Sequence, residues 1–359
     1  MPKPTLTAKD IVTWYSKNAR DLPWRKTIDP YKIWLSEIIL QQTTVAQGTS
    51  YYLKFISVYP TLTDLASAPI DDVLKNWQGL GYYSRARNLH FSANYIINEC
   101  NGIFPNNYID LLKLKGVGAY TAAAISSFSY KENKVVVDGN VIRVISRLYG
   151  INEAVDNPKV LKLIKEKAQQ LCDTQSPEVF NQAIMEFGAL QCKAKNPNCK
   201  SCPLQKSCIA YKKNIQDQIP FKAKRIKKTN RYFKYCFFII DNSKTLIIKR
   251  SEKDIWQGLY EFPLLELEAL EEEHGFVMPK NIKIRPSEVL TSKIFKHQLT
   301  HQTIRAVFYK TYISQADYNL MLKKGVFNNY LLINVENINK YALPRLIDLY
   351  LNDLSITLF

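Results

Sequence analysis

The sequence predicts an all-α domain followed by a smaller α+β domain. From Ile11 to about Tyr211, apolar residues recur three and four positions apart and short turns contain Gly, Pro or Asn, which is the pattern of amphipathic helices. From Tyr235 onward this spacing gives way to short runs rich in Phe, Ile and Thr, which indicate strands. A chain of 359 residues is long enough for two domains, because a typical domain holds about 150 residues.

The composition is that of an ordinary folded protein. Hydrophobic residues make up 46% of the chain and charged residues 23%, and these values exclude a disordered or fibrous protein. Apolar runs such as Cys236–Ile240 are much shorter than the roughly 18 residues of a membrane-spanning helix. The first ten residues lack the apolar core of a signal peptide. We therefore expect a soluble, cytoplasmic protein that has no membrane partner.

Positive charge is concentrated between the two patterned regions. The chain has 49 Lys and Arg against 32 Asp and Glu, a net charge of +17. Residues 219–234 alone contribute seven basic residues and no acidic residue. This stretch predicts a basic linker between a first domain of residues 1–218 and a nearly neutral second domain of residues 235–359. The excess charge favours a polyanionic partner such as nucleic acid, and an ordinary solvated surface is the alternative.

One break in the helical region carries a specific signal, the turn Gly116-Val117-Gly118. Two glycines suit a tight turn that leaves no room for a Cβ atom. The helix that follows begins with exposed backbone N–H groups, which can bind a phosphate oxygen. Together with the flanking leucines and the following Thr121-Ala122, the turn predicts a helix-hairpin-helix element, which is typical of proteins that bind the DNA backbone without reading the sequence.

The second domain has its own local signals. Cys236–Ile240 and Thr245–Ile248 are strand-like runs, and Asp241–Lys244 between them predicts a hairpin. A further strand is expected near Gln302–Ile313. A helix is expected over about Leu264–His274.

Four of the seven cysteines are grouped within 17 residues, at Cys192, Cys199, Cys202 and Cys208. Four thiolates this close can enclose one metal centre, either a zinc ion or an iron–sulfur cluster. The uneven gaps of six and five residues suit a bulky cluster better than a compact zinc site. Disulfides are less compatible with the absence of an export signal. The other three cysteines are expected to be buried core thiols: Cys100, Cys172 and Cys236.

Two carboxylates occupy unusual positions. Glu37 interrupts the apolar run Trp34–Leu40, where burial would raise its pKa and let it donate a proton near neutral pH. Asp138 follows the apolar run Val135–Val137 at the start of the next predicted helix. The alternatives are a surface glutamate between core residues and a helix N-cap aspartate. Two carboxyl groups in different environments suit hydrolysis of a glycosidic bond, since one protonates the leaving group and the other supports an oxocarbenium-like centre.

Five motifs together resemble a known family. They are Leu22-Pro-Trp-Arg25, Leu40-Gln-Gln-Thr43, Gly79-Leu-Gly-Tyr-Tyr83, Gly116-Val-Gly118 and Val137-Asp-Gly-Asn140. With the four-cysteine loop in the expected order, residues 1–212 resemble the endonuclease III superfamily of helix-hairpin-helix DNA glycosylases. Within that superfamily, nearly the whole chain looks like the MutY-type adenine DNA glycosylases.

The resemblance implies removal of adenine mispaired with 8-oxoguanine or guanine in double-stranded DNA, after the adenine has been flipped out of the duplex. It also implies a [4Fe–4S] cluster on the four grouped cysteines. Glu37 would protonate adenine at N7, Asp138 would stabilise or briefly capture the sugar cation, and Tyr120 and Asn140 would orient the carboxylates and the water. Superfamily members that also cut the strand have a lysine at the position of Tyr120. A phenol cannot form a Schiff base, so a monofunctional glycosylase is expected.

The resemblance further implies contacts to DNA. The residues expected in the adenine pocket are Trp24, Arg25 and Gln182. Gln42 and Tyr82 are expected to wedge into the base stack beside the orphan base, and the turn of Gly116, Val117 and Gly118 is expected to hold the DNA backbone. Ordinary helix packing is the alternative for Gln182 and Tyr82. Thr44 replaces a glutamine or arginine common in the family, which puts any contact there in doubt.

The second domain resembles Nudix domains, the fold of enzymes that hydrolyse oxidised nucleotides, through Trp256-Gln-Gly-Leu-Tyr-Glu-Phe-Pro263. Glu271-Glu-Glu-His-Gly275 lacks the spaced carboxylates that a Nudix hydrolase needs for magnesium, so a recognition domain without hydrolase activity is expected. By resemblance, a Phe-Ser-His loop senses 8-oxoguanine. Its best match here is Leu299, Thr300 and His301, in which Leu299 lacks the aromatic face. Phe295-Lys-His297 is an alternative register.

Other functions stay open at this stage. One is an endonuclease III-like glycosylase and lyase acting on oxidised pyrimidines, against which Tyr120 and the second domain count. Another is a non-catalytic iron–sulfur protein that binds DNA or acts as a scaffold, against which Glu37 and Asp138 count. A stand-alone Nudix hydrolase fits less well still. We expect a monomer that acts in base excision repair in a bacterial cytoplasm, associated with the nucleoid through DNA and followed by downstream repair proteins.

Overall fold

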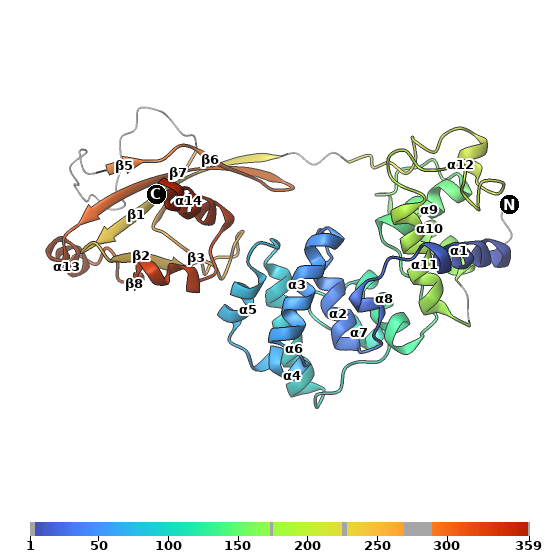
Figure 1. Ribbon diagram of the computed structural model, residues 1–359, viewed down its shortest axis with the longest axis horizontal. Coiled ribbons are helices and arrows are strands. Elements are labelled where there is room, and N and C mark those ends of the chain that lie inside the picture. Colours follow the sequence, from blue (N-terminus) through green and yellow to red (C-terminus); the bar gives the residue numbers. More distant parts are fainter. Residues whose placement is uncertain (1–3, 173–174, 225–227, 269–288, 358–359) are drawn as a thin grey trace. The chain divides into compact units, whose positions relative to one another are not determined.

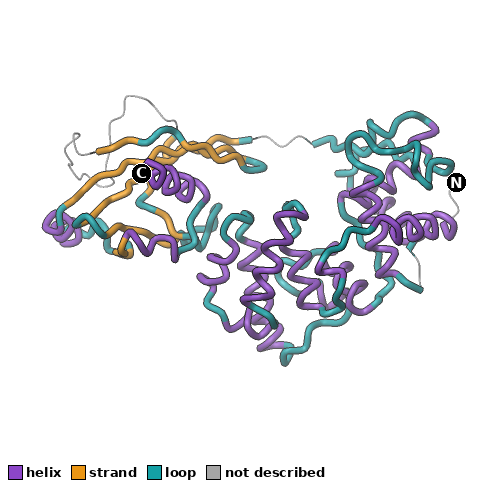
Figure 2. The backbone as a smooth tube through the Cα atoms, viewed as in Figure 1, coloured by secondary structure: helices purple, strands orange, loops and turns teal. Residues whose placement is uncertain are grey.

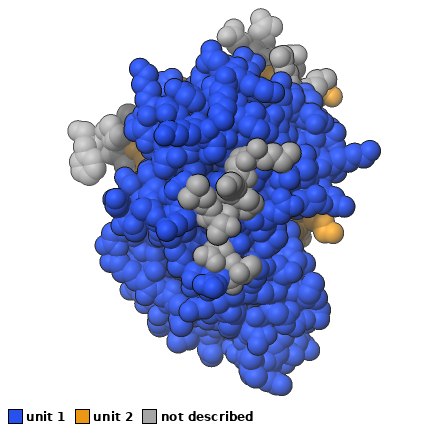
Figure 3. Space-filling model, turned by 90° about the vertical axis from the view of Figure 1, so that its right-hand side faces the viewer, with its two compact units in different colours: residues 1–67, 88–225 blue, residues 68–87, 226–359 orange. Residues whose placement is uncertain are grey.

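The computed structural model describes residues 4–172, 175–224, 228–268 and 289–357. The chain separates into two compact units, which are coloured separately in Figure 3. Unit 1 contains residues 1–67 and 88–225, and unit 2 contains residues 68–87 and 226–359. No helix among the described residues is long and apolar enough to cross a bilayer.

Unit 1 is helical, as the sequence predicted (Figures 1 and 2). Its elements are α1 Pro4–Asn18, η1 Pro23–Arg25, α2 Pro30–Ile39, α3 Val45–Val58, α4 Leu62–Ser67, α6 Ser84–Glu99, α7 Tyr108–Leu111, α8 Ala119–Tyr130, α9 Gly139–Tyr149, α10 Pro158–Leu171, α11 Pro177–Leu190 and α12 Ile209–Lys212, the first four residues of α6 being counted in unit 2. Proline suits the first helical position because that position needs no backbone N–H partner. The preceding Asp29 and Asn157 cap α2 and α10 by accepting a backbone hydrogen bond.

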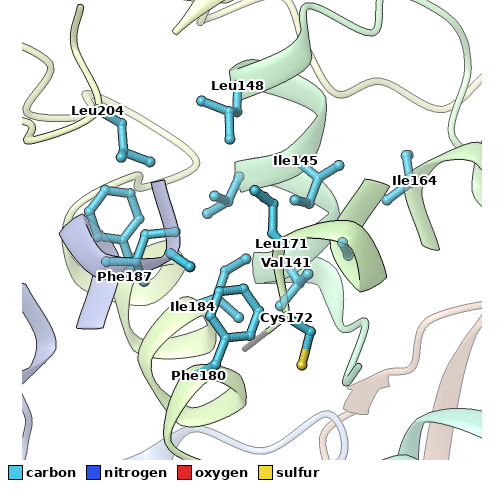
Figure 4. Packing of buried hydrophobic residues seen from close by; sticks show 14 of the residues in the cluster. Val141, Ile145, Leu148, Ile164, Leu171, Cys172, Phe180, Ile184, Phe187 and Leu204 are labelled. Atoms are coloured by element: carbon cyan, nitrogen blue, oxygen red, sulfur yellow. The ribbon is translucent and has the colours of Figure 1, made fainter. Parts of the chain in front are cut away.

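One core cluster of unit 1 lies between α9, α10 and α11 (Figure 4). Its members from α9 and α11 include Val141, Ile145, Leu148, Phe180, Ile184 and Phe187. Leu204, which lies in the loop of the grouped cysteines, is 3% exposed and belongs to the same cluster. A fully buried large apolar side chain contributes about 1.5–3 kcal/mol to stability. This core therefore holds the start of α9 and the cysteine loop in place.

Unit 2 is built on a mixed sheet. Its elements are α5 Ile70–Trp77, β1 Thr229–Ile240, β2 Lys244–Lys249, β3 Tyr260–Glu261, β4 Leu264–Leu267, β5 Val289–Thr291, β6 Phe295–Gln298, β7 Gln302–Ile313, α13 Gln315–Lys323, β8 Leu331–Asn334, η3 Val335–Lys340 and α14 Arg345–Thr357. The strand order is β3-β2-β1-β7-β5, with β4 beside β1, β6 beside β7 and β8 beside β2. β1 and β7 pair in parallel along their whole length, and the other described pairs are antiparallel.

The predicted hairpin and the predicted strand near Gln302–Ile313 are confirmed. Ile240 lies opposite Lys244 across the hairpin. Asp241 and Asn242 between them have φ angles of 47° and 54°. Asp and Asn tolerate this left-handed backbone, which tight hairpin turns require.

The helix predicted over Leu264–His274 is wrong at its start, because Leu264–Leu267 forms strand β4. Its backbone pairs with Tyr232–Tyr235 of β1, so tertiary pairing outweighs a helical apolar spacing. Residues 269–274, the rest of that predicted helix, lie outside the described residues. So does all of Glu271–Gly275, the segment expected to lack magnesium ligands.

The predicted linker contributes to both units. Before it leaves unit 1, the chain is fastened there, because the carboxylate of Asp156 accepts hydrogen bonds from the backbone N–H groups of Ala223 and Lys224. From Thr229 onward the chain is part of β1. Unit 2 also takes in residues 68–87, which the sequence placed in the first domain. The domain boundaries at 218 and 235 stay predictions.

Candidate active site

A cavity of about 230 Å³ lies in unit 1 and brings distant parts of the chain together. Seven residues expected at the catalytic site and the adenine pocket line it: Trp24, Arg25, Glu37, Tyr120, Asp138, Asn140 and Gln182. They come from η1, α2, α8, α11 and the start of α9. Pockets for drug-sized ligands measure about 300–1,000 Å³. This smaller cavity suits a ligand of the size of one nucleobase.

Glu37 is buried in this cavity, with 6% of its surface exposed. It lies on α2 among buried apolar side chains, so the alternative of a surface glutamate is wrong. The hydroxyl of Tyr120 donates to Glu37 Oε2 at 2.7 Å. Burial raises the pKa of Glu37 to about 7, although the bond from Tyr120 acts to lower it. The carboxyl group therefore changes its protonation state near neutral pH.

Asp138 caps α9, as the alternative for this residue predicted, and it also lines the cavity. Its catalytic role stays a prediction. Its Oδ1 accepts from the backbone N–H of Val141 at 2.8 Å, and its Oδ2 accepts from Asn140 Nδ2 at 2.7 Å. Burial raises the pKa of Asp138, and these hydrogen bonds oppose the rise because they favour the charged form.

A second ionic group in the cavity was missed from the sequence. Glu186 of α11 forms ion pairs with Arg20 at 2.6 Å and with Arg25 at 2.8 Å. Burial acts to raise the pKa of Glu186, but the hydrogen bonds from the two arginines prevail and lower it to about 2. The available signal was the one used for Glu37, a carboxylate within an apolar run, here Ile184–Phe187. Glu186 fixes Arg25 in the pocket wall.

Gln182 and Trp24 are each held by a tyrosine that does not line the cavity. Gln182 Oε1 accepts from the hydroxyl of Tyr15 at 2.9 Å, and Trp24 packs edge-on against Tyr52. Among the described residues that line the cavity there is no lysine. Tyr120 lines the cavity, and its expected place at the position of the lyase lysine stays a prediction.

The glycine turn differs between its two glycines. Gly116 has a φ of 84°, and a Cβ there would lie 2.8 Å from the Cβ of Asn88. Gly118 caps α8 with an ordinary φ of −93°, and a Cβ there would meet nothing within 4 Å. Only Gly116 is required by the fold of the turn, whereas Gly118 leaves the start of α8 open to an approaching ligand. Val117 between them is buried.

The four grouped cysteines lie on the loop between α11 and α12 and form no disulfide among themselves. Burial raises the pKa values of Cys202 and Cys208, and the nearby thiol of Cys192 raises both further. Arg147 Nη1 donates to Cys192 Sγ at 3.4 Å. Within the part of the chain that the structure describes, no three His, Cys, Asp or Glu side chains form a ready site for a single metal ion.

Arg143, also missed from the sequence, connects this loop to the cavity. Its Nε donates to the carbonyl of Cys192 at 2.7 Å, and its Nη2 donates to Asn140 Oδ1 at 2.7 Å. Asn140 in turn donates to Asp138. Of the isolated thiols, Cys172 and Cys236 are buried as predicted. Cys100, which follows the end of α6, is only partly buried, so the prediction of a buried core thiol is wrong there.

Gln42 lies outside the cavity lining, exposed on the loop after α2. Its φ of 59° is in the left-handed region, which costs of order 1–3 kcal/mol for a residue other than glycine. Thr44, to which no DNA contact was assigned, caps α3 by accepting from the backbone N–H of Gln47.

A second cavity, of about 560 Å³, lies within unit 2. Its lining includes Tyr82 and all three residues expected to read 8-oxoguanine, Leu299, Thr300 and His301. His297 also lines it and stacks on Trp256, with ring centroids 5.9 Å apart. Phe295, from the alternative register, is 7% exposed and packs edge-on against Phe308 and Tyr350 of the core. Its ring is therefore not available to a base.

Comparison with known proteins matches both units. Residues 35–174 match the model of the HhH-GPD superfamily of base excision DNA repair proteins, and residues 235–353 match that of the NUDIX domain. The chain is 38% identical over 299 residues to an adenine DNA glycosylase of Buchnera aphidicola subsp. Baizongia pistaciae, covering 82% of each chain. It is 41% identical over 224 residues to an adenine DNA glycosylase of Rattus norvegicus, covering 60% of this chain and 43% of that protein.

A solved thermostable thymine-DNA glycosylase is similar to the helical part. It has a TM-score of 0.54 and 33% identity, covering 58% of this chain and 96% of that one. These matches confirm the predicted helix-hairpin-helix glycosylase fold and the Nudix-like region. Since the Buchnera relative is matched over most of its length, the chain belongs to the adenine DNA glycosylase family, within the HhH-GPD superfamily of base excision repair proteins.

Proposed function

We propose that this chain is a monofunctional glycosylase that hydrolyses the N-glycosidic bond of adenine mispaired with 8-oxoguanine or guanine in double-stranded DNA. The observation that carries the proposal is that Glu37 and Asp138 line one base-sized cavity in different environments. The adenine DNA glycosylase relatives support the choice of base. The product, an abasic site, would begin base excision repair.

Glu37 is the proposed general acid. With a pKa of about 7, a large fraction of its carboxyl groups carries a proton at neutral pH. The cavity holds the flipped adenine, and Glu37 gives its proton to N7 of that base. The bond from C1′ to the base then breaks, and its electron pair leaves with a neutral adenine. The hydrogen bond from Tyr120 keeps the carboxyl group oriented toward the base.

Asp138 is the proposed support of the positive charge that develops on the sugar. Its hydrogen bonds from Val141 and Asn140 favour the carboxylate form that this role needs. By family resemblance, it captures C1′ briefly before water completes the hydrolysis. The absence of a lysine from the described cavity lining supports hydrolysis without strand cleavage.

The grouped cysteines are the proposed ligands of a [4Fe–4S] cluster. Four thiols with no disulfide among them and a nearby arginine donor fit such a cluster chemically. When bound, the cluster would hold the loop from Cys192 to Cys208 in one shape. The hydrolysis itself uses the carboxyl groups.

The DNA contacts are proposed from placement. A Cβ at Gly118 would meet nothing within 4 Å, so there is space for a phosphate to approach the N-terminus of α8. Gln42 and Tyr82 are exposed and have left-handed backbone, which suits residues that insert into a base stack. Leu299, Thr300 and His301 line a cavity, where they can meet the base opposite adenine.

Single-turnover excision from a panel of duplexes tests the proposal. The panel pairs A, C, T or G with 8-oxoguanine and with guanine, and each reaction is analysed with and without alkali. Adenine release from 8-oxoguanine:A and G:A, with nicks that need alkali, is expected. Glu37→Gln should lose excision and keep DNA binding, whereas the matched variant Glu153→Gln at an exposed glutamate should remain active.

The same panel separates the other functions. Nicks without alkali, or release of pyrimidines in preference to adenine, would support the lyase instead. DNA binding with no base release from any duplex would support a non-catalytic protein. Either result would overturn the proposal.

A further inference from the structure

The hydroxyl of Tyr82 is hydrogen-bonded to the hydroxyl of Thr300, although 218 positions separate them in the sequence. Both residues belong to unit 2 and line its cavity. Their proposed tasks differ, since Tyr82 wedges into the base stack and Thr300 reads the base opposite adenine. The hydrogen bond therefore connects two residues whose proposed roles in DNA recognition are different.

Tyr82 is held firmly for a residue that is 46% exposed. Its backbone φ is 47°, and the guanidinium of Arg85 lies 5.6 Å from the centre of its ring. The segment that carries it is fastened in unit 2 at both ends. Asp71 pairs with Lys249 at one end, and Arg87 donates to the carbonyl of Gln257 at 2.6 Å at the other.

Thr300 is held from the other side by the turn between β6 and β7. The backbone N–H of Leu299 donates to the carbonyl of Gln302 at 2.8 Å, which closes the turn. The N–H of Thr229 in β1 donates to the carbonyl of His301 at 3.1 Å. Hydrogen bonds thus fix both the loop that carries the Thr300 hydroxyl and the segment that carries Tyr82.

We infer that Tyr82 and Thr300 act as one recognition unit. Their hydrogen bond fixes the Tyr82 ring beside the loop of Leu299, Thr300 and His301 before DNA binds. This inference rests on the proposed function. A side chain that is already ordered does not lose its freedom on binding, so preorganisation strengthens the complex. Insertion of Tyr82 into the base stack and the contact of Thr300 with the opposite base then form in one step. Only a base that fits the loop of Thr300 gains the full increase in binding affinity.

A double-mutant cycle tests this coupling. Tyr82→Phe and Thr300→Val each remove one hydroxyl and keep the size of the side chain, and Thr300→Ser is the matched control that keeps the hydroxyl. The measured quantity is the dissociation constant for a duplex with 8-oxoguanine opposite a non-hydrolysable adenine nucleotide. Each hydroxyl deletion should weaken binding about two- to tenfold, the effect of one neutral hydrogen bond. The double variant should bind no more weakly than the weaker single variant.

Two results would overturn the inference. One is a double variant whose loss equals the product of the single losses, because the hydroxyls would then act independently. The other is a Thr300→Ser protein that binds as weakly as Thr300→Val, because the hydroxyl would then be irrelevant.

A measurement without DNA keeps this test separate from the proposed function. Fluorotyrosine placed at position 82 gives a fluorine resonance that reports the order of the ring. Thr300→Val should shift and narrow this resonance toward that of a mobile ring, and Thr300→Ser should not. An unchanged resonance in Thr300→Val would refute the pairing even if excision is normal. A lack of preference for 8-oxoguanine with the pairing intact would refute the proposed function alone.

Discussion

Replacing Glu37 by glutamine should abolish adenine excision and stabilise the fold above neutral pH. The pKa of Glu37 rises from 4.5 to about 7 on burial, so the folded chain holds this proton more tightly than the unfolded chain does. The stability that results is complete below pH 4.5 and is lost as the pH rises through 7. The difference in pKa corresponds to about 3 kcal/mol in the free energy of unfolding.

Glutamine does not titrate and can still accept the hydrogen bond from Tyr120. The free energy of unfolding of Glu37→Gln should therefore exceed that of the wild type by about 1 kcal/mol at pH 5 and by about 3 kcal/mol at pH 8. Urea unfolding at the two pH values measures this gain, and single-turnover excision measures the loss of activity. A protein that works with a buried ionisable acid thus gives up stability at the pH where it works.

Glu186→Gln is a matched control with the opposite sign. Its pKa is lowered to about 2, so the stability it provides is present above the unfolded value of 4.5 and lost as the pH falls toward 2. Because it leaves the paired Arg20 and Arg25 without their carboxylate, this variant should lose about 3 kcal/mol or more at pH 8. Equal stability of Glu37→Gln and the wild type at both pH values, or continued excision by that variant, would refute the role of Glu37 as a buried acid.

Three further changes give distinct results. Tyr120→Phe removes the hydrogen bond that lowers the pKa of Glu37, so the decline of the excision rate on the basic side should move to higher pH; a decline at the wild-type pH would contradict the contact. Gly116→Ala should lower the free energy of unfolding in urea by more than about 1 kcal/mol, because the φ of Gly116 is positive. Gly118→Ala should keep the stability and weaken DNA binding. Equal losses of stability in the two variants would contradict the difference between the two glycines. Cys202→Ser should lower the bound iron and the stability together, measured by metal analysis and urea unfolding, and an unchanged iron content would argue against a four-cysteine cluster.

The sequence marked both proposed catalytic residues through local signals, and the family resemblance then chose between those roles and the alternatives of a surface glutamate and a helix cap. Glu37 interrupts an apolar helical run, and burial follows directly from the side chains on either side of it. Asp138 stands between an apolar run and a helix start, and there it is both a cap and part of the cavity. Such arguments need only a few neighbouring positions.

What the sequence could not supply are partners that lie far away along the chain. Glu186 has the same local signal as Glu37, but nothing local says that Arg20, 166 positions earlier, neutralises it. Strand β4 carries a helical spacing, and only its pairing with β1 makes it extended. Nothing in the composition of residues 68–87 marks them as a part of unit 2.

The position of Arg143 has a consequence for the newly made protein. It donates both to the carbonyl of Cys192, where the cysteine loop begins, and to the carboxamide of Asn140 beside Asp138. A chain whose loop has not yet closed therefore lacks a brace next to the carboxylate that we propose supports the sugar cation. We therefore expect slow base excision from a molecule whose cysteine loop has not yet reached this conformation.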